Sequence, residues 1–280
     1  MPGDPADAVS SRETSGNDGS VKDAECIHFL QWSLPRLGLR WAGFRRVRGQ
    51  VCKRLHRRLA VLGLKDLSDY RALLAADAAE RRQLDSLCRV SVSLFYRDQG
   101  VWRCLERDLL PQLAVQALAR GENRVRIWSA GCASGEEPYT LALMFALGDI
   151  LKSGEPEIFA TDADPHLLSR AWRACYPGSS LRELPAKWRA AFERSGEEYC
   201  LGPEYRTPVR FLAQDIRRDL PDGRFDLVLC RNLAFTYFQA PLQAAIATRR
   251  GARSARGSAA RVPRVATRGS TGARAGADVA

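Results

Sequence analysis

Two glutamates follow a glycine-rich turn in residues 125–144, whose sequence is VRIWSAGCASGEEPYTLALM. The stretch begins as an apolar run of strand character. Gly131 and Gly135 then allow a tight turn with close approach of the backbone to a ligand. Glu136 and Glu137 open an amphipathic helix, where the helix dipole favours negative charge. A phosphate-binding loop needs neutral or positive groups at this point, so the carboxylates indicate a ligand that carries positive charge.

A third carboxylate, Asp162, lies near the end of a second apolar run, EIFATDAD, at residues 157–164. The carboxyl ends of parallel strands meet at one edge of a sheet, where such sheets bind ligands, and a carboxylate there typically accepts hydrogen bonds from a ribose diol. A nucleotide with a cationic end suits Glu136 and Asp162, and S-adenosylmethionine, which has an amino group, a sulfonium and no phosphate, is one. The alternative is structural: Glu136 only caps its helix, and Asp162 precedes a helix start with Asp164 as N-cap.

The elements that must position these carboxylates alternate between strands and helices from about Arg124 onward. Apolar strand patterns cover 125–131, 157–164, 209–216 and 224–232, and helical patterns cover 136–152 and 165–176. A short helix is predicted over 186–196 and a small hairpin near 197–212. This alternation is typical of a parallel sheet covered on both faces, so the predicted fold class is α/β.

Residues 21–118 have a helical pattern and predict a small N-terminal helical domain with a linker helix that breaks near Pro111. One predicted helix, at 51–64, ends at Gly63. Its apolar face consists of Val51, Leu55, Leu59 and Leu62. Its other face is basic and consists of Lys53, Arg54, Arg57 and Arg58. A charged face of this kind is by default simply solvated.

The cysteines and histidines do not predict a metal site. The eight cysteines form no C-x-x-C pair, and no apolar signal segment precedes them, so we expect reduced and mostly buried thiols. His28, His56 and His166 are too scattered to ligate one ion. No apolar run reaches the roughly 20 residues that cross a bilayer, so we expect a cytoplasmic protein without membrane insertion.

The net charge of +11 is concentrated at one end of the chain. Residues 241–280 contain eight arginines and a single acid, Asp278, so this segment carries +7 and the remaining 240 residues carry +4. Specific nucleic-acid binding is therefore not predicted. Segments 1–20 and 248–280 are predicted to be disordered tails because they lack apolar periodicity. No strand pattern follows residue 232, so we expect a sheet that lacks its last strands, as in a truncated or frameshifted chain.

Several stretches occur in the order found in the CheR family, the chemoreceptor glutamate methyltransferases. The first motif, IWSAGCASGEEPYTLALM at 127–144, resembles that family's cofactor turn. Four further stretches are similar to family motifs: RLHRRLAVLGL, SVSLFYRD, FATDADPHLLSRA and FDLVLCRN followed by YF. The resemblance covers about residues 25–240. It implies a class I methyltransferase domain at 119–247, with S-adenosylmethionine as cofactor.

The resemblance also implies which residues form the site. Those implied to contact the cofactor are Ser91, Ser93, Arg97, Ala130, Glu136, Asp162, Asp215, Ile216, Arg231 and Asn232. Glu136 would take the methionine amino group, Asp162 the ribose, and Asp215 and Ile216 would border the adenine. Arg97 and Tyr237 are implied to orient the incoming carboxylate. Two of these residues have structural alternatives to a role in the site. Arg97 could be a surface arginine paired with Asp98, and Arg231 could form only a structural ion pair.

The implied activity is methylation of glutamate side chains on a chemoreceptor-like signalling protein in chemotaxis. The basic face Lys53, Arg54, Arg57 and Arg58 would dock the acidic receptor helices, and the enzyme would act as a monomer. Two alternatives stay open. The chain could be an inactive relic that only binds S-adenosylmethionine, or a methyltransferase for another acceptor such as RNA or a small acid.

Overall fold

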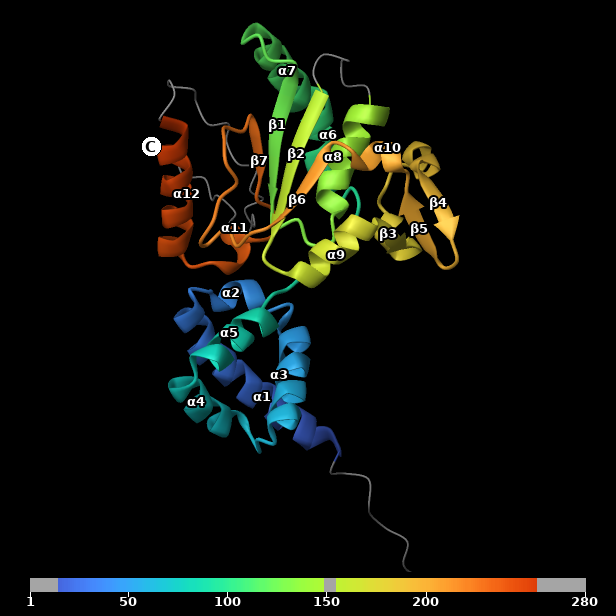
Figure 1. Cartoon of the computed structure of the whole chain (residues 1–280). Coiled ribbons are helices and arrows are strands. Elements are labelled where there is room, and N and C mark those ends of the chain that lie inside the picture. The colour runs from blue at the N-terminus through green and yellow to red at the C-terminus, as the bar shows by residue number, and fades with distance from the viewer. Residues whose placement is uncertain (1–14, 149–154, 256–280) are drawn as a thin grey trace, which may run out of the picture. The chain divides into compact units, whose positions relative to one another are not determined.

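The computed structural model describes residues 15–148 and 155–255. The chain divides into two compact units (Figure 1): residues up to Val90 together with Tyr237–Gln239, and Ser91–Thr236 with the segment from Ala240. The predicted tails were too long, because 15–20 and 248–255 are helical; Ala and Arg, frequent in 248–255, favour helices. The rest of both predicted tails, 1–14 and 256–280, lies outside the described residues.

The first unit is a set of short helices. They are α1 (Ser15–Ser33), the 3-10 turn η1 (Leu34–Leu37), α2 (Trp41–Phe44), α3 (Arg48–Leu62), α4 (Leu67–Ala76) and α5 (Ala78–Leu87). Asp66 and Asp77 cap α4 and α5, each accepting two backbone N–H bonds. Gly63 ends α3 in the left-handed conformation at φ 66°, as predicted. None of the helices in the described part of the chain is long and apolar enough to cross a bilayer.

The second unit contains a four-stranded parallel sheet, which confirms the predicted α/β class. Its strands are β1 (Arg124–Ala130), β2 (Glu155–Asp162), β6 (Val209–Ala213) and β7 (Leu227–Leu229), in the order β6-β2-β1-β7. The helices of this unit are α6 (Gln99–Cys104), α7 (Leu110–Ala119), α8 (Glu136–Leu147), α9 (Pro165–Arg173), α10 (Pro203–Arg206), α11 (Ala234–Tyr237) and α12 (Ala240–Ala255). α7 contacts β1, and both α8 and α9 contact β2. Figure 1 shows the four strands side by side, with α12 on the β7 side of the sheet.

A small antiparallel sheet occupies the segment where a hairpin was predicted. It consists of β3 (Cys175–Pro177), β4 (Phe192–Ser195) and β5 (Glu198–Leu201), in the order β3-β5-β4. The hairpin turns at Gly196, so it begins earlier than the predicted 197–212 and takes its first strand from the end of the predicted helix 186–196. Only the 3-10 turn Ala186–Ala191 remains of that helix.

Two disulfides correct the expectation of eight reduced thiols. Cys26 bonds to Cys52, which joins α1 to α3, and Cys175 bonds to Cys200, which joins β3 to β5. The partners are separated by 26 and 25 residues in sequence and meet only because their elements are neighbours in the fold. Spacing along the chain therefore gave no signal for these pairs. The remaining four cysteines are free: Cys88, Cys104, Cys132 and Cys230.

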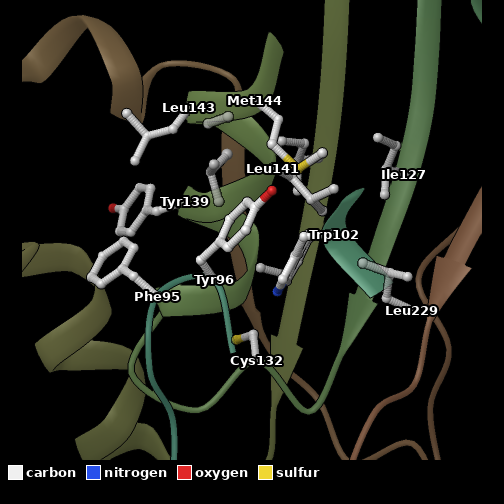
Figure 2. Packing of buried hydrophobic residues seen from close by; sticks show 14 of the residues in the cluster. Phe95, Tyr96, Trp102, Ile127, Cys132, Tyr139, Leu141, Leu143, Met144 and Leu229 are labelled. Carbon is white, nitrogen blue, oxygen red and sulfur yellow. The ribbon is translucent and has the colours of Figure 1, made fainter. Parts of the chain in front are cut away.

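Aromatic residues anchor the segment that precedes α6 in the core of the second unit. Figure 2 shows Phe95, Tyr96 and Trp102 packed among side chains of α8 and of the central strands. All three are at most 5% exposed. A π-helical turn, Leu105–Leu109, follows α6 just before Pro111, which is the irregularity predicted there. The segment from Ser91 to Asp98 is thus held against the same core as the turn after β1.

Candidate functional site

The turn after β1 is fixed by backbone bonds to the neighbouring strand. The N–H groups of Gly131 and Cys132 both donate to the carbonyl of Thr161, at 2.8 and 3.0 Å. Gly131 has φ +77°, and a Cβ on it would lie 2.6 Å from the Leu233 side chain. Only glycine therefore fits at this position. The turn that the sequence predicted at the carboxyl end of β1 is present.

Asp162 ends β2 and holds this turn through its side chain. Its carboxylate accepts the N–H of Ala133 at 2.9 Å and the N–H of Asp164 at 2.9 Å. A carboxylate offers about four lone-pair positions, so one such group can serve several donors at once. Asp164 in turn caps α9 by accepting the N–H groups of His166 and Leu167. Asp164 thus has the capping role that the sequence predicted for it, and Asp162 is left as a polar group at the strand end.

Glu136 is a buried carboxylate at the first turn of α8. The residue is 2% exposed, and its carboxylate accepts bonds from the hydroxyl of Ser134 at 2.9 and 3.1 Å and from Ser93. Burial raises the pKa of Glu136 above its ordinary value of 4.5, and these hydrogen bonds oppose that rise. Within the described ranges no arginine or lysine forms a salt bridge with it. A cationic ligand would compensate this carboxylate.

Glu137, the next residue, is compensated by the protein itself. Its carboxylate accepts the hydroxyl of Ser129 at 2.8 Å and pairs with Arg231 at 3.3 Å. Burial raises the pKa of Glu137, and Arg231 opposes this effect. The sequence showed Glu137 at the helix start but gave no sign of these two partners. The two neighbouring glutamates therefore differ in their partners: Glu137 pairs with Arg231, whereas Glu136 accepts bonds from the hydroxyl groups of Ser134 and Ser93.

Arg231 ties several segments of the second unit together. Besides Glu137, its guanidinium donates to the Arg97 carbonyl at 2.6 Å and pairs with Asp98 at 2.9 Å. It also stacks over the Trp102 ring, with 4.9 Å from Cζ to the ring centroid. The side chain is 9% exposed. The structural alternative for Arg231, an ion pair, thus describes its contacts with Glu137 and Asp98. Asp98 pairs with Arg231 and, in the described structure, not with Arg97.

The segment from Ser91 to Asp98 presents three of the predicted cofactor contacts. Ser93 reaches the Glu136 carboxylate, whereas Ser91 is exposed. The guanidinium of Arg97 donates to the Val92 carbonyl at 2.5 Å and is partly exposed. The backbone of this segment is fixed because the Tyr96 N–H donates to the Thr140 hydroxyl at 3.1 Å.

The carboxyl end of β6 contributes a polar and an apolar group. Asp215 is held by Arg217 in a salt bridge of 2.6 Å, and Ile216 is 5% exposed. Gln214 donates its N–H to the Asp162 carbonyl at 3.0 Å. Its Oε1 is buried and has no hydrogen-bond partner in the described structure. The sequence analysis missed Gln214, although a polar residue at a strand end is the signal that identified Asp162.

The remaining predicted residues are distributed between the two units. Ala130 is the buried last residue of β1, and Asn232 is exposed with φ 52°. Tyr237 belongs to the first unit, where its ring lies edge-on to Phe44 at 5.1 Å between centroids.

The predicted basic face of α3 divides into two kinds of side chain. Arg54 donates to the carbonyls of Leu87 and Arg89, and Arg58 forms a forked pair with the Glu80 carboxylate. Lys53 and Arg57 are exposed. Two of the four predicted docking residues thus have contacts inside the helical unit, and the other two face solvent.

The site as a whole fits S-adenosylmethionine. It combines a tight glycine turn, a half-buried strand-end carboxylate that accepts two backbone N–H bonds, and a buried carboxylate that forms no salt bridge among the described residues. Bound there, the cofactor supplies an electrophilic methyl group. Glu136 would hold its amino group and Asp162 its ribose, while the apolar Ile216 suits the adenine.

The comparison with known families agrees with this chemistry. Residues 91–258 match the family described as "CheR methyltransferase, SAM binding domain". A chemotaxis protein methyltransferase of Listeria innocua is 37% identical over 168 residues, which are 60% of this chain and 62% of that protein. The chain thus spans 62% of the length of the Listeria relative.

Other relatives are covered more fully. A chemotaxis protein methyltransferase of Klebsiella aerogenes is 31% identical over 244 residues, which are 82% of this chain and 78% of that protein. Chemotaxis protein methyltransferase 1 of Pseudomonas aeruginosa is 30% identical over 205 residues, 69% of this chain and 72% of that protein. Because the matched domain covers more than half of its length, the chain belongs to the CheR methyltransferase family, and S-adenosylmethionine is the cofactor of its α/β unit.

Proposed function

We propose that this protein transfers the methyl group of S-adenosylmethionine to glutamate side chains of a chemoreceptor-like signalling protein, forming glutamyl methyl esters. The observation that carries the proposal is Glu136, a carboxylate that is 2% exposed and has only hydroxyl and backbone donors for partners. A ligand with a positive amino group is the simplest means of compensating it. The relatives are chemotaxis protein methyltransferases, which supports the signalling context.

The proposed reaction needs little proton chemistry from the protein. A glutamate side chain has an unperturbed pKa of about 4.3, so it is already an anion and a nucleophile at neutral pH. One carboxylate oxygen forms the new bond to carbon as the bond from the methyl to the sulfonium breaks, and the thioether S-adenosylhomocysteine leaves. The protein then accelerates the reaction by holding the two reactants in line and by excluding water.

Arg97 is proposed to orient the incoming carboxylate. Its guanidinium is partly exposed and lies on the segment that also carries Ser93, a hydrogen-bond partner of Glu136. A guanidinium matches a carboxylate in a bidentate geometry. Tyr237, the last residue of α11, is proposed to assist. Neither residue needs to gain or lose a proton.

The exposed part of the basic helix is proposed to dock the acceptor. Lys53 and Arg57 are the exposed members of the face, whereas Arg54 and Arg58 have contacts within the helical unit. An acidic receptor helix would meet Lys53 and Arg57 first. Docking of this kind raises the encounter rate and is weakened by salt.

The test uses the full chain, S-adenosylmethionine with a radioactive methyl group and the cytoplasmic fragment of a methyl-accepting chemoreceptor. We expect label on the fragment that mild base releases as methanol, because a glutamyl methyl ester is base-labile. The matched control is the same fragment with its methyl-accepting glutamates replaced by glutamine, which should stay unlabelled. Base-stable label, or equal label on the control fragment, would overturn the proposal.

A further inference from the structure

A pocket in the helical unit lies outside everything assigned so far. Its volume is about 260 Å³, and it is formed where the end of α1 and η1 meet α4 and α5. Its lining residues are Trp32, Ser33, Arg36, Leu37, Leu74, Ala75, Arg81 and Leu84. All of them lie before residue 91, where the match to the cofactor-binding domain begins.

One of the lining residues, Ser33, has an unpartnered polar atom. Ser33 is 1% exposed, and its Oγ has no hydrogen-bond partner in the described structure. Ser33 stands at the start of η1 without forming a side-chain cap there. Leu74 and Leu84 beside it are at most 4% exposed. A buried hydroxyl without a partner costs free energy, so a ligand that offers a hydrogen bond here would relieve that cost.

The rim of the pocket is cationic. Arg36 and Arg81 are both exposed lining residues. Each uses Nη1 in a bond to a backbone carbonyl, Arg36 to Trp32 at 2.6 Å and Arg81 to Leu74 at 2.7 Å. Among the described residues no bond from Nε or Nη2 of either side chain is formed, so these donors are available. No acidic side chain lines the pocket in the part of the chain that the structure describes.

We infer that this pocket binds a small aromatic acid with a polar group at the end opposite its carboxylate. The carboxylate would lie between Arg36 and Arg81. The ring would lie against Leu74 and Leu84, and the far polar group at Ser33, because the Trp32 ring already has the Arg36 guanidinium over it, with 4.3 Å from Cζ to the ring centroid. The volume is near the lower end of the range of about 300–1,000 Å³ for small-molecule sites, which limits the ligand to a single ring. The site would work independently of methyl transfer.

Three probes of one shape test this inference by calorimetry on the full chain. 3-(4-Hydroxyphenyl)propionate carries both polar ends, 3-phenylpropionate lacks the hydroxyl, and tyramine replaces the carboxylate with an ammonium. We expect the hydroxylated acid to bind with a Kd between about 0.1 and 1 mM. Loss of its hydroxyl should weaken binding about three- to tenfold, and tyramine should bind more weakly than either acid.

Variants then assign each end of the ligand. Ser33→Ala should abolish the preference for the hydroxylated acid, and Arg81→Gln should weaken both acids about three- to tenfold. Arg82→Gln, at an exposed residue of α5 that does not line the pocket, is the matched control and should change nothing.

Several outcomes would overturn the inference. One is that the hydroxylated acid does not bind even at concentrations several times the upper end of the expected Kd range. The others are that tyramine binds as tightly as the acids, or that Arg81→Gln and Arg82→Gln lose the same affinity. The probe comparison on the wild-type chain decides the matter even where Ser33→Ala does not fold. Because the readout is binding, failure here would leave the methyl-transfer proposal untouched.

Discussion

At the scale of residues, the site depends on a difference between two adjacent glutamates. Glu137 has Arg231 and Ser129 as partners, whereas Glu136 is buried with only hydroxyl and backbone donors. Burial of a carboxylate without a counter-charge destabilises its ionised form. This cost is present at Glu136, and in the proposed function the cationic amino group of the cofactor would offset it.

This arrangement predicts how cofactor affinity depends on pH. Burial raises the pKa of Glu136 above 4.5 in the free protein, and the cationic amino group of the cofactor would lower it again. The complex therefore holds fewer protons than the free protein in this range, so affinity should rise with pH until Glu136 is fully ionised. Calorimetric titrations from about pH 5 to 8, in buffers of different ionisation enthalpy, measure the affinity and the protons released.

The matched variant is Glu136→Gln, which keeps the size of the side chain but cannot ionise. Its cofactor affinity should be weaker at neutral pH by roughly one to two orders of magnitude and should not change with pH. The same pH dependence in the variant as in the wild type would mean that another group titrates.

The sequence predicted these residues unevenly. Glu136 and Asp162 could be identified because a glycine turn and a strand end place them locally, through contacts within a few residues. The partners of Arg231 could not be predicted, because its hydrogen-bond acceptors belong to Glu137 and to residues 97–98, which are more than ninety positions away in the sequence. Ser93 entered only through the family resemblance, as a cofactor contact, and its bond to Glu136 was not predicted.

At the scale of elements, Arg231 fixes the segment that precedes α6. Arg231→Gln removes the charge that faces Glu137 and Asp98. Loss of one partner of a buried pair costs about 3–5 kcal/mol, and partial exposure reduces this to roughly 2–4 kcal/mol here. We expect a fall in melting temperature of roughly 5–10 °C. Calorimetric melts of the variant and of Arg103→Gln, an exposed arginine of α6, provide the comparison.

A double variant separates this pair from a general loss of packing. Glu137→Gln combined with Arg231→Gln removes both charges, so its loss of stability should be smaller than the sum of the two single losses. Strictly additive losses would show that Arg231 acts without Glu137.

The basic helix α3 combines structural and exposed arginines, which a sequence pattern cannot separate. Arg58 donates two bonds to Glu80, which also accepts the Tyr70 hydroxyl at 2.6 Å. Arg58 holds the pKa of the Glu80 carboxyl below its ordinary value of 4.5. Arg58→Ala should therefore cost roughly 2–3 kcal/mol of unfolding free energy at neutral pH, while Arg57→Ala should stay within about 0.5 kcal/mol.

The pH dependence of this difference checks its cause. A carboxyl with a depressed pKa contributes stability above its unfolded pKa and loses it as pH falls through its folded pKa. The difference in unfolding free energy between wild type and Arg58→Ala, measured by urea denaturation, should therefore become smaller below about pH 4.5. If Arg57→Ala lost as much unfolding free energy as Arg58→Ala, the structural role of Arg58 would be contradicted.

Elements were predicted best where their own periodicity is strong. The strands of the parallel sheet and the α3 stop at Gly63 follow from local pattern. β4 did not, because residues 192–195 alternate weakly and adopt strand structure through pairing with β5. The helix α12 was cut short in the prediction because its polar second half, rich in Ala and Arg, has no apolar periodicity.

At the scale of the whole molecule, each unit contains one disulfide. Counting reactive thiols before and after reduction tests both bonds. Of the eight cysteines, four are in disulfides, so the unfolded and unreduced chain should show four reactive thiols. After reduction it should show eight. Each bond closes a loop of about 25 residues and stabilises its unit by roughly 3 kcal/mol, so reduction should also lower the melting temperature. Eight thiols before reduction would refute both bonds.

The division into two units assigns the cofactor to one of them. The turn after β1, Glu136 and Asp162 all lie in the second unit, so its ability to bind S-adenosylmethionine should depend on those carboxylates and not on the basic helix. Asp162 and Asp164 make a matched pair two residues apart. Asp162 stands at the end of β2 beside the turn after β1, whereas Asp164 caps α9.

The most direct measurement is the Kd of S-adenosylmethionine for the full chain and for Asp162→Asn and Asp164→Asn. We expect wild-type binding, a loss of roughly one to two orders of magnitude in affinity for Asp162→Asn, and a nearly unchanged affinity for Asp164→Asn. Asp164→Asn should also keep most of its stability, because Asn is a good N-cap. Unchanged affinity in a folded Asp162→Asn, or no wild-type binding at all, would contradict the account of this site.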